Sequence, residues 1–172
     1  MTPHRQPDRR SRGPLALTQL AALALAIAAC GSVSPAKGTY TLDFPSTLDA
    51  IASDGVQVFV FPYDGSADTC AALVEERKTG SPLPTPLAQT AQQTPCSLQS
   101  GAAPLPDMSF GQYAFLAVAT RTQYGDFLIG CAAQTLSSTN TLVTIPLELT
   151  DFQNPLPTTK CTSLSQSCAG GC

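Results

Sequence analysis

Four oxygen-bearing residues stand at the spacing that a calcium loop uses. Asp64, Ser66 and Asp68 take the first, third and fifth positions of such a loop, and Glu75 takes the twelfth. The sixth position holds Thr69 instead of the glycine that the sharp turn requires, and the residues after it fit a helix. We therefore interpret this stretch as the start of a helix, with calcium binding as the alternative.

Carboxylates are the other groups that could do chemistry. Glu75 and Glu76 are adjacent, so on a helix they point in different directions and cannot share a proton. Exposed aromatic side chains near turns could instead form a ligand platform, and Tyr63, Phe110 and Tyr124 are the candidates. Tyrosines in turns usually pack on the rim of a fold, so rim packing is the first interpretation of these rings and a ligand platform is the alternative.

The N-terminus has the charge and hydropathy of an export signal. Four arginines and a single acid precede an apolar run over residues 14–29. A membrane-spanning helix needs about 20 apolar residues. This run is shorter and contains Thr18 and Gln19, so a permanent transmembrane segment is the weaker interpretation.

The residues that end this run, Ile27-Ala28-Ala29-Cys30-Gly31, resemble the lipobox of bacterial lipoprotein precursors. The resemblance implies that residues 1–29 are a signal peptide, that Cys30 is acylated with palmitate-type chains and that residues 30–37 form a tether. Gly31 in place of an aspartate implies delivery to the outer membrane, on its periplasmic or surface-exposed face. The lipid bilayer is then a partner through Cys30, because two acyl chains suffice for stable anchoring.

Removal of residues 1–29 changes which functions the chain can have. It leaves five basic and eleven acidic residues, a net charge of -6, and it removes His4, the single histidine. Mechanisms that use Ser-His-Asp or Cys-His groups and metal sites with histidine ligands are thereby excluded. An acidic chain without a basic cluster also argues against nucleic-acid binding. We expect neither a cofactor nor a bound metal.

Six cysteines remain after the lipobox cysteine, an even number that predicts three disulfides in an exported protein. They are Cys70, Cys96, Cys131, Cys161, Cys168 and Cys172. The last three lie within the final twelve residues, so complete pairing requires one or three bridges between tail and body. A metal cluster, a redox pair and a tail cysteine that bridges two chains are the alternatives.

Alternating hydropathy predicts a mainly β domain over residues 38–150. Strands are expected at residues 38–44, 55–61, 112–121, 126–134 and 141–149, and one helix is expected at residues 68–79. Residues 45–54 fit either a helical turn or a strand. Six prolines make residues 81–106 a long irregular loop, and Pro146 places the last strand at a sheet edge.

These elements predict a small antiparallel β-sandwich with one short helix, a long Pro-rich loop and a disulfide-stapled C-terminal tail over residues 151–172. Gly111-Gln112-Tyr113, followed by an apolar strand, is similar to the entry of the central hairpin in prealbumin-like sandwich domains. That resemblance implies a small exported domain, often without catalysis. We therefore expect a noncatalytic binding or structural module with a protein or glycan ligand. A carboxylate-dependent hydrolase or carbohydrate-active enzyme is the alternative.

Overall fold

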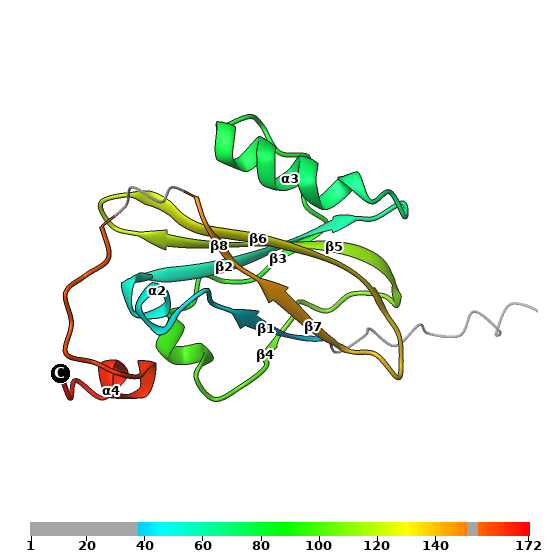
Figure 1. Ribbon diagram of the computed structural model, residues 1–172. Coiled ribbons are helices and arrows are strands. Elements are labelled where there is room, and N and C mark those ends of the chain that lie inside the picture. Colours follow the sequence, from blue (N-terminus) through cyan, green and yellow to red (C-terminus); the bar gives the residue numbers. More distant parts are fainter. Residues whose placement is uncertain (1–37, 151–154) are drawn as a thin grey trace, which may run out of the picture. The chain divides into compact units, whose positions relative to one another are not determined.

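Two β-sheets pack face to face in the computed structural model, which describes residues 38–150 and 155–172 (Figure 1). One sheet has five strands in the order β3-β2-β5-β6-β8, and the other has three in the order β4-β1-β7. The predicted mainly β sandwich with a disulfide-held tail is confirmed. Within the described residues, no helix has both the length and the hydropathy needed to cross a bilayer.

The five-stranded sheet is built around β5 (Gly111–Arg121), which pairs antiparallel with β2 (Gly55–Pro62) on one side and β6 (Gly125–Leu136) on the other. The two-residue strands β3 (Ala88–Gln89) and β8 (Glu148–Leu149) form its edges. Apolar and β-branched residues on both faces of β2 and β5 explain their central position, because a strand covered on both sides is apolar throughout.

The three-stranded sheet has β1 (Thr39–Asp43) at its centre. Strand β4 (Ala103–Pro104) pairs antiparallel with β1, whereas β7 (Leu142–Pro146) runs parallel to it over five residues. This parallel pair departs from the expected antiparallel arrangement. It is possible because the long chain between β1 and β7 passes through the other sheet before it returns.

The predicted helix is α3 (Asp68–Thr79), which lies on the outer face of the larger sheet (Figure 1). The stretch that fitted either a turn or a strand forms α2 (Thr47–Ala52), and the tail contains α4 (Leu164–Cys168). Ser46 begins α2, since its hydroxyl accepts from the backbone N–H of Asp49 and donates to the Asp49 carboxylate at 2.7 Å. Helix α4 was not predicted from the sequence.

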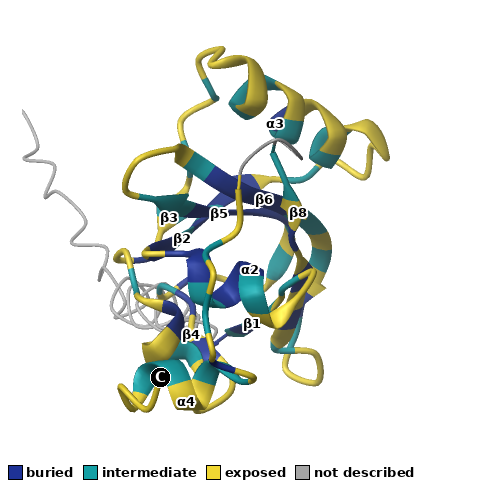
Figure 2. Ribbon diagram, turned by 60° about the vertical axis from the view of Figure 1, so that its left-hand side comes forward, coloured by how far each residue is buried: buried dark blue, intermediate teal, exposed yellow. Residues whose placement is uncertain are grey.

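Buried side chains form two clusters, one on each face of the larger sheet. The buried residues of its strands are the dark blue parts of the ribbon in Figure 2. Phe115, Ala117 and Ala119 of β5 point into the space between the sheets. The alternate residues of β5 point toward α3, where Leu73 is 4% exposed. Strand β5 is thus covered on both sides, which is the position its apolar sequence predicts.

The predicted strand over residues 141–149 is divided between the two sheets. Strand β7 ends at Pro146 on the edge of the small sheet, Leu147 is buried between the sheets, and β8 pairs with β6. The chain crosses β6 where Gly130 stands, and a side chain at that glycine would overlap the carbonyl oxygen of Pro146. The edge position predicted from Pro146 is therefore confirmed, and Gly130 is required for the crossing.

The Pro-rich loop over residues 81–106 lies along one side of the sandwich. Strand β3 in its first half pairs with β2, and β4 at its end pairs with β1, so the loop covers one edge of each sheet. Between them the 3-10 helix η1 (Pro95–Leu98) begins at Thr94, whose hydroxyl accepts from the N–H of Ser97. The loop is therefore part of the folded domain and covers one side of the two sheets.

Substitution of Gly130 by alanine tests the crossing. The added methyl group would meet backbone, which cannot rotate away, so we expect a loss of about 1 to 3 kcal/mol in the free energy of unfolding. Urea denaturation with the disulfides intact measures this loss. Gly171→Ala is the matched control, because the nearest atom to its added methyl group lies at 3.4 Å. Equal unfolding midpoints for the two variants would contradict this account of the crossing.

Candidate functional site

The turn between β5 and β6 presents an exposed tyrosine at one end of the larger sheet. The backbone N–H of Tyr124 donates to the carbonyl of Arg121 at 2.9 Å, and Gly125 closes the turn with a φ of 72°. That left-handed conformation favours glycine. Tyr124 is 39% exposed, although it belongs to a turn between two long paired strands. The predicted hairpin turn is confirmed, and it holds the ring at a fixed place.

The side chain of Arg121 supports this tyrosine. Its guanidinium lies 4.6 Å from the centroid of the Tyr124 ring and 5.5 Å from that of Phe127. It also donates to the backbone carbonyl of Pro155 at 2.5 Å, which ties the start of the described tail to the hairpin. The ring is therefore stacked on a cation that is itself held by other groups.

Two polar hollows meet at Tyr124, and we call this region the Tyr124 site. The first hollow has a volume of about 520 Å³ and lies between the C-terminal end of α3 and the hairpin. It is lined by Arg77, Lys78, Thr79, Gly80, Tyr124, Asp126, Ile129 and Thr150. The second has a volume of about 300 Å³ and is lined by Asp54, Arg121, Thr122, Gln123 and Tyr124.

An ion pair fixes the wall of the first hollow. Two guanidinium nitrogens of Arg77 donate to the two carboxylate oxygens of Asp126 at 2.6 and 3.0 Å. Bidentate pairs of this kind add geometric specificity. Both side chains are about one-third exposed, so their contribution to stability is modest, and their main effect is to hold α3 against β6.

Asp54 occupies the second hollow as a stable anion. Its carboxylate accepts from the hydroxyl and the backbone N–H of Thr122, and these bonds hold the pKa of Asp54 below its usual range. Because its folded pKa is depressed, the interaction is present above the usual carboxyl pKa. It is lost as the pH falls through the folded value. At neutral pH the hairpin is therefore tied to the end of α2.

A different hollow, which we call the apolar hollow, lies near the tail. It has a volume of about 250 Å³ and is lined by Tyr40, Thr41, Leu42, Phe44, Pro95, Leu98, Gly101 and Leu164. Its walls come from β1, η1 and α4, so the Pro-rich loop does border a cavity. Few polar groups converge there, and polar groups are what fix the orientation of a ligand. The Tyr124 site is therefore the stronger candidate.

The cysteines form three bridges within the chain. One bridge, Cys70–Cys131, joins α3 to β6 in the body, and Cys161–Cys172 closes a loop within the tail. The third, Cys96–Cys168, links η1 to α4 and is the one bridge between tail and body. One bridge between tail and body is one of the two numbers that complete pairing allows. All six cysteines are paired, so none of them is available for a metal cluster or for a bridge between chains.

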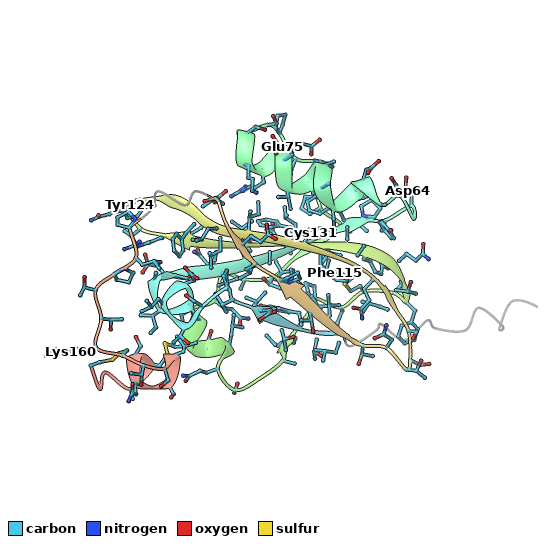
Figure 3. All side chains as sticks on the ribbon, viewed as in Figure 1. Asp64, Glu75, Phe115, Tyr124, Cys131 and Lys160 are labelled. Carbon is cyan, nitrogen blue, oxygen red and sulfur yellow. A yellow bond between two sulfur atoms is a disulfide. The ribbon has the colours of Figure 1, made fainter. Side chains whose placement is uncertain are left out.

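The residues with calcium-loop spacing do not form a ligand cage. An Asp64 carboxylate oxygen accepts from the N–H of Ser66 at 2.9 Å, and the Ser66 hydroxyl accepts from the N–H of Asp68. Figure 3 shows Asp64 in the loop before α3 and Glu75 farther along the helix. No three acidic, histidine or cysteine residues come together as a metal site in the described residues. Asp64 and Ser66 instead stabilise the turn that precedes α3, whose N-cap residue, Ala67, has no side-chain capping bond, and Glu75 lies within the helix.

Tyr124 was predicted from the sequence, but the residues around it were not. Arg121 and Asp126 flank the same turn as Tyr124, whereas Asp54 and Arg77 lie far from it in the sequence. Pairing of β2 with β5 brings Asp54 to this end of the sheet, and packing of α3 on β6 brings Arg77. Of the other candidate aromatics, Phe110 is 48% exposed at the start of β5, and Tyr63 packs against the cluster beneath α3. Cys30 and residues 1–37 lie outside the described residues.

Comparisons with known proteins give one distant similarity. No protein-family model and no curated protein matches the sequence. A solved structure named "putative polysaccharide binding proteins (DUF1812)", from Bacteroides thetaiotaomicron, is similar with 12% sequence identity and a TM-score of 0.43. The match covers 65% of this chain and 46% of that one, so the chain spans about half the length of its neighbour. A similarity of this size establishes neither a shared fold nor a shared ligand.

Proposed function

We propose that this protein is an exported, lipid-anchored and noncatalytic module that binds a saccharide at the Tyr124 site. The observation that carries the binding proposal is the exposed Tyr124 ring between two polar hollows. The volume of the first hollow, about 520 Å³, lies within the range of 300 to 1,000 Å³ typical of ligand sites.

The aromatic ring suits one face of a sugar. A tyrosine has a flat apolar body and a polar tip, and a sugar ring has C–H groups on its faces and hydroxyl groups around its edge. The stacked guanidinium of Arg121 restricts the Tyr124 ring before a ligand arrives. Because a restricted side chain loses little conformational entropy on binding, this arrangement favours affinity.

The polar groups suit the hydroxyl groups of a sugar. Lys78, Thr79, Thr150 and Gln123 line the two hollows with groups that donate or accept hydrogen bonds. They come from the end of α3, the hairpin and the residue after β8. Different elements therefore surround the tyrosine with hydrogen-bonding groups, as a ligand with hydroxyls on several sides requires.

The carboxylates support binding over hydrolysis. Cleavage of a glycosidic bond commonly uses two carboxyl groups about 5 to 9.5 Å apart, on opposite sides of the bond. Each hollow of the Tyr124 site is lined by one acid. Asp126 is paired with Arg77 and Asp54 is bound by Thr122, so neither is free to act as acid or nucleophile. This favours a noncatalytic module over the carboxylate-dependent enzyme.

The anchoring part of the proposal rests on the lipobox resemblance at Cys30. Residues 31–37 separate that cysteine from the first described residue, Gly38, and seven residues reach at most about 25 Å. Acylation at Cys30 would therefore keep the folded domain close to the membrane. We propose the outer membrane, on its periplasmic or surface-exposed face.

Loss of the tyrosine ring tests the binding site. We expect at least one of four soluble polysaccharides (dextran, mannan, xylan and polygalacturonate) to retard the exported protein in affinity gel electrophoresis. Tyr124→Ala should weaken that binding about tenfold, because base–aromatic stacking, a comparable interaction, is worth 1 to 3 kcal/mol. Phe110→Ala is the matched control, since Phe110 is also an exposed aromatic residue but lies at the opposite end of β5.

Two results would contradict the binding proposal. The first is the absence of retardation by all four polysaccharides. The second is retardation that Tyr124→Ala and Phe110→Ala weaken equally. Circular dichroism of both variants checks that each retains the β-rich fold.

Substitution of Cys30 tests the anchor. Cells that express the protein are grown with an alkyne analogue of palmitate, and the label is read on the purified protein. We expect label on the wild-type protein and on Ser32→Ala, and none on Cys30→Ala, because the sulfur of Cys30 is the acylation site that the lipobox implies. The anchor would be rejected if Cys30→Ala were labelled as strongly as Ser32→Ala.

A further inference from the structure

We propose that the saccharide bound at the Tyr124 site is acidic, a polysaccharide whose sugar units carry carboxylate or sulfate groups. This inference rests on the proposed function and adds the chemical class of the ligand. It follows from where the positive charges of the chain lie.

Basic residues are scarce in the domain and gather at one place. The described residues contain four basic and ten acidic side chains, a net charge of -6. Three of the four basic residues, Arg77, Lys78 and Arg121, line the two hollows of the Tyr124 site. The fourth, Lys160, lies in the tail, well apart from Tyr124 in Figure 3. An otherwise acidic domain therefore has a locally cationic site.

Stability of α3 explains only part of this distribution. Basic residues in the last turn of a helix interact favourably with its dipole, and Arg77 and Lys78 occupy that turn. Arg121 belongs to β5, where no such interaction applies. The hairpin brings it beside the same tyrosine, so the three charges converge from two elements for a reason other than helix stability.

The site also has a net positive charge once its internal pairs are counted. Arg77, Lys78 and Arg121 bring three positive charges against the two carboxylates of Asp126 and Asp54, so one positive charge remains. Asp126 is paired with Arg77, and the charge of Asp54 is stabilised by the donors of Thr122 and offsets that of Arg121. Lys78 is exposed, and within the described part of the chain it makes no ion pair. A ligand anion beside Lys78 would thus meet an uncompensated ammonium group next to an exposed aromatic ring.

Two matched pairs of polysaccharides test the inference. Polygalacturonate is compared with its methyl ester, and dextran sulfate with dextran, so the members of each pair share a polysaccharide backbone and only one of them carries anionic groups. We expect the exported protein to bind the charged member of at least one pair about tenfold more tightly in affinity gel electrophoresis. The difference should shrink when NaCl is raised from about 50 mM to about 500 mM, because salt screens exposed charges.

Lysine variants locate the effect. Lys78→Gln should weaken binding of the charged member about threefold to fivefold, in keeping with an exposed ion pair. Lys160→Gln, which removes the same charge from the tail, should leave it unchanged. If the neutral members bind as tightly as the charged ones, or if the two variants behave alike, the inference is wrong and the proposed function stands. If none of the four probes nor mannan nor xylan binds, both fail.

Discussion

The pairing of β5 with a long strand on each side is the constraint on which the rest of the structure depends. Because β5 is central, its apolar residues lie on two faces that must both be covered. The small sheet covers one face and α3 covers the other. The pairing also fixes the end of the hairpin, because Tyr124 sits in a turn between the two longest strands. Arg77 on α3 reaches Asp126 at that end, and Asp54 after α2 reaches Thr122. The site therefore combines the residues of one hairpin with two groups, Arg77 and Asp54, that come from distant parts of the sequence.

The opposite side of the domain is organised by covalent links. A small sheet of three strands, two of them with prolines, buries little surface by itself, and the Pro-rich loop and the tail cover what it leaves open. Cys96–Cys168 joins these two irregular segments, and Leu164 then closes the apolar hollow. A disulfide that closes a long loop restricts the unfolded chain strongly, which stabilises a small domain. The Tyr124 site thus lies at a paired hairpin, whereas the Pro-rich loop and the tail cover the small sheet.

Much of the fold could be predicted because the periodicity of hydropathy and the residues that form turns can be recognised within short stretches of sequence. The helix at α3 and the strands at β1, β2, β5 and β6 follow directly from alternation and from the residues that end them. The break after Pro146 could not be predicted, because it depends on a backbone contact with Gly130 across β6. The residues that form the Tyr124 site were even harder to predict from the sequence. Helical spacing with Cys70 and Leu73 predicts that Arg77 faces the body, but only the packing of α3 on β6 gives it Asp126 as its partner. The spacing of Asp64 and Glu75 also fits a calcium loop, but the helix carries Glu75 away from Asp64, so the two side chains do not form a ligand cage.

The central claim is that a sugar ligand binds beside Tyr124 and away from the apolar hollow. A titration of the isotope-labelled protein with a short oligogalacturonate, followed by backbone amide chemical shifts, tests it most directly. The account predicts that the largest changes fall on Thr79, Gly80 and residues 122–124. Changes concentrated on Leu98 and Leu164, or spread evenly over the domain, would contradict it.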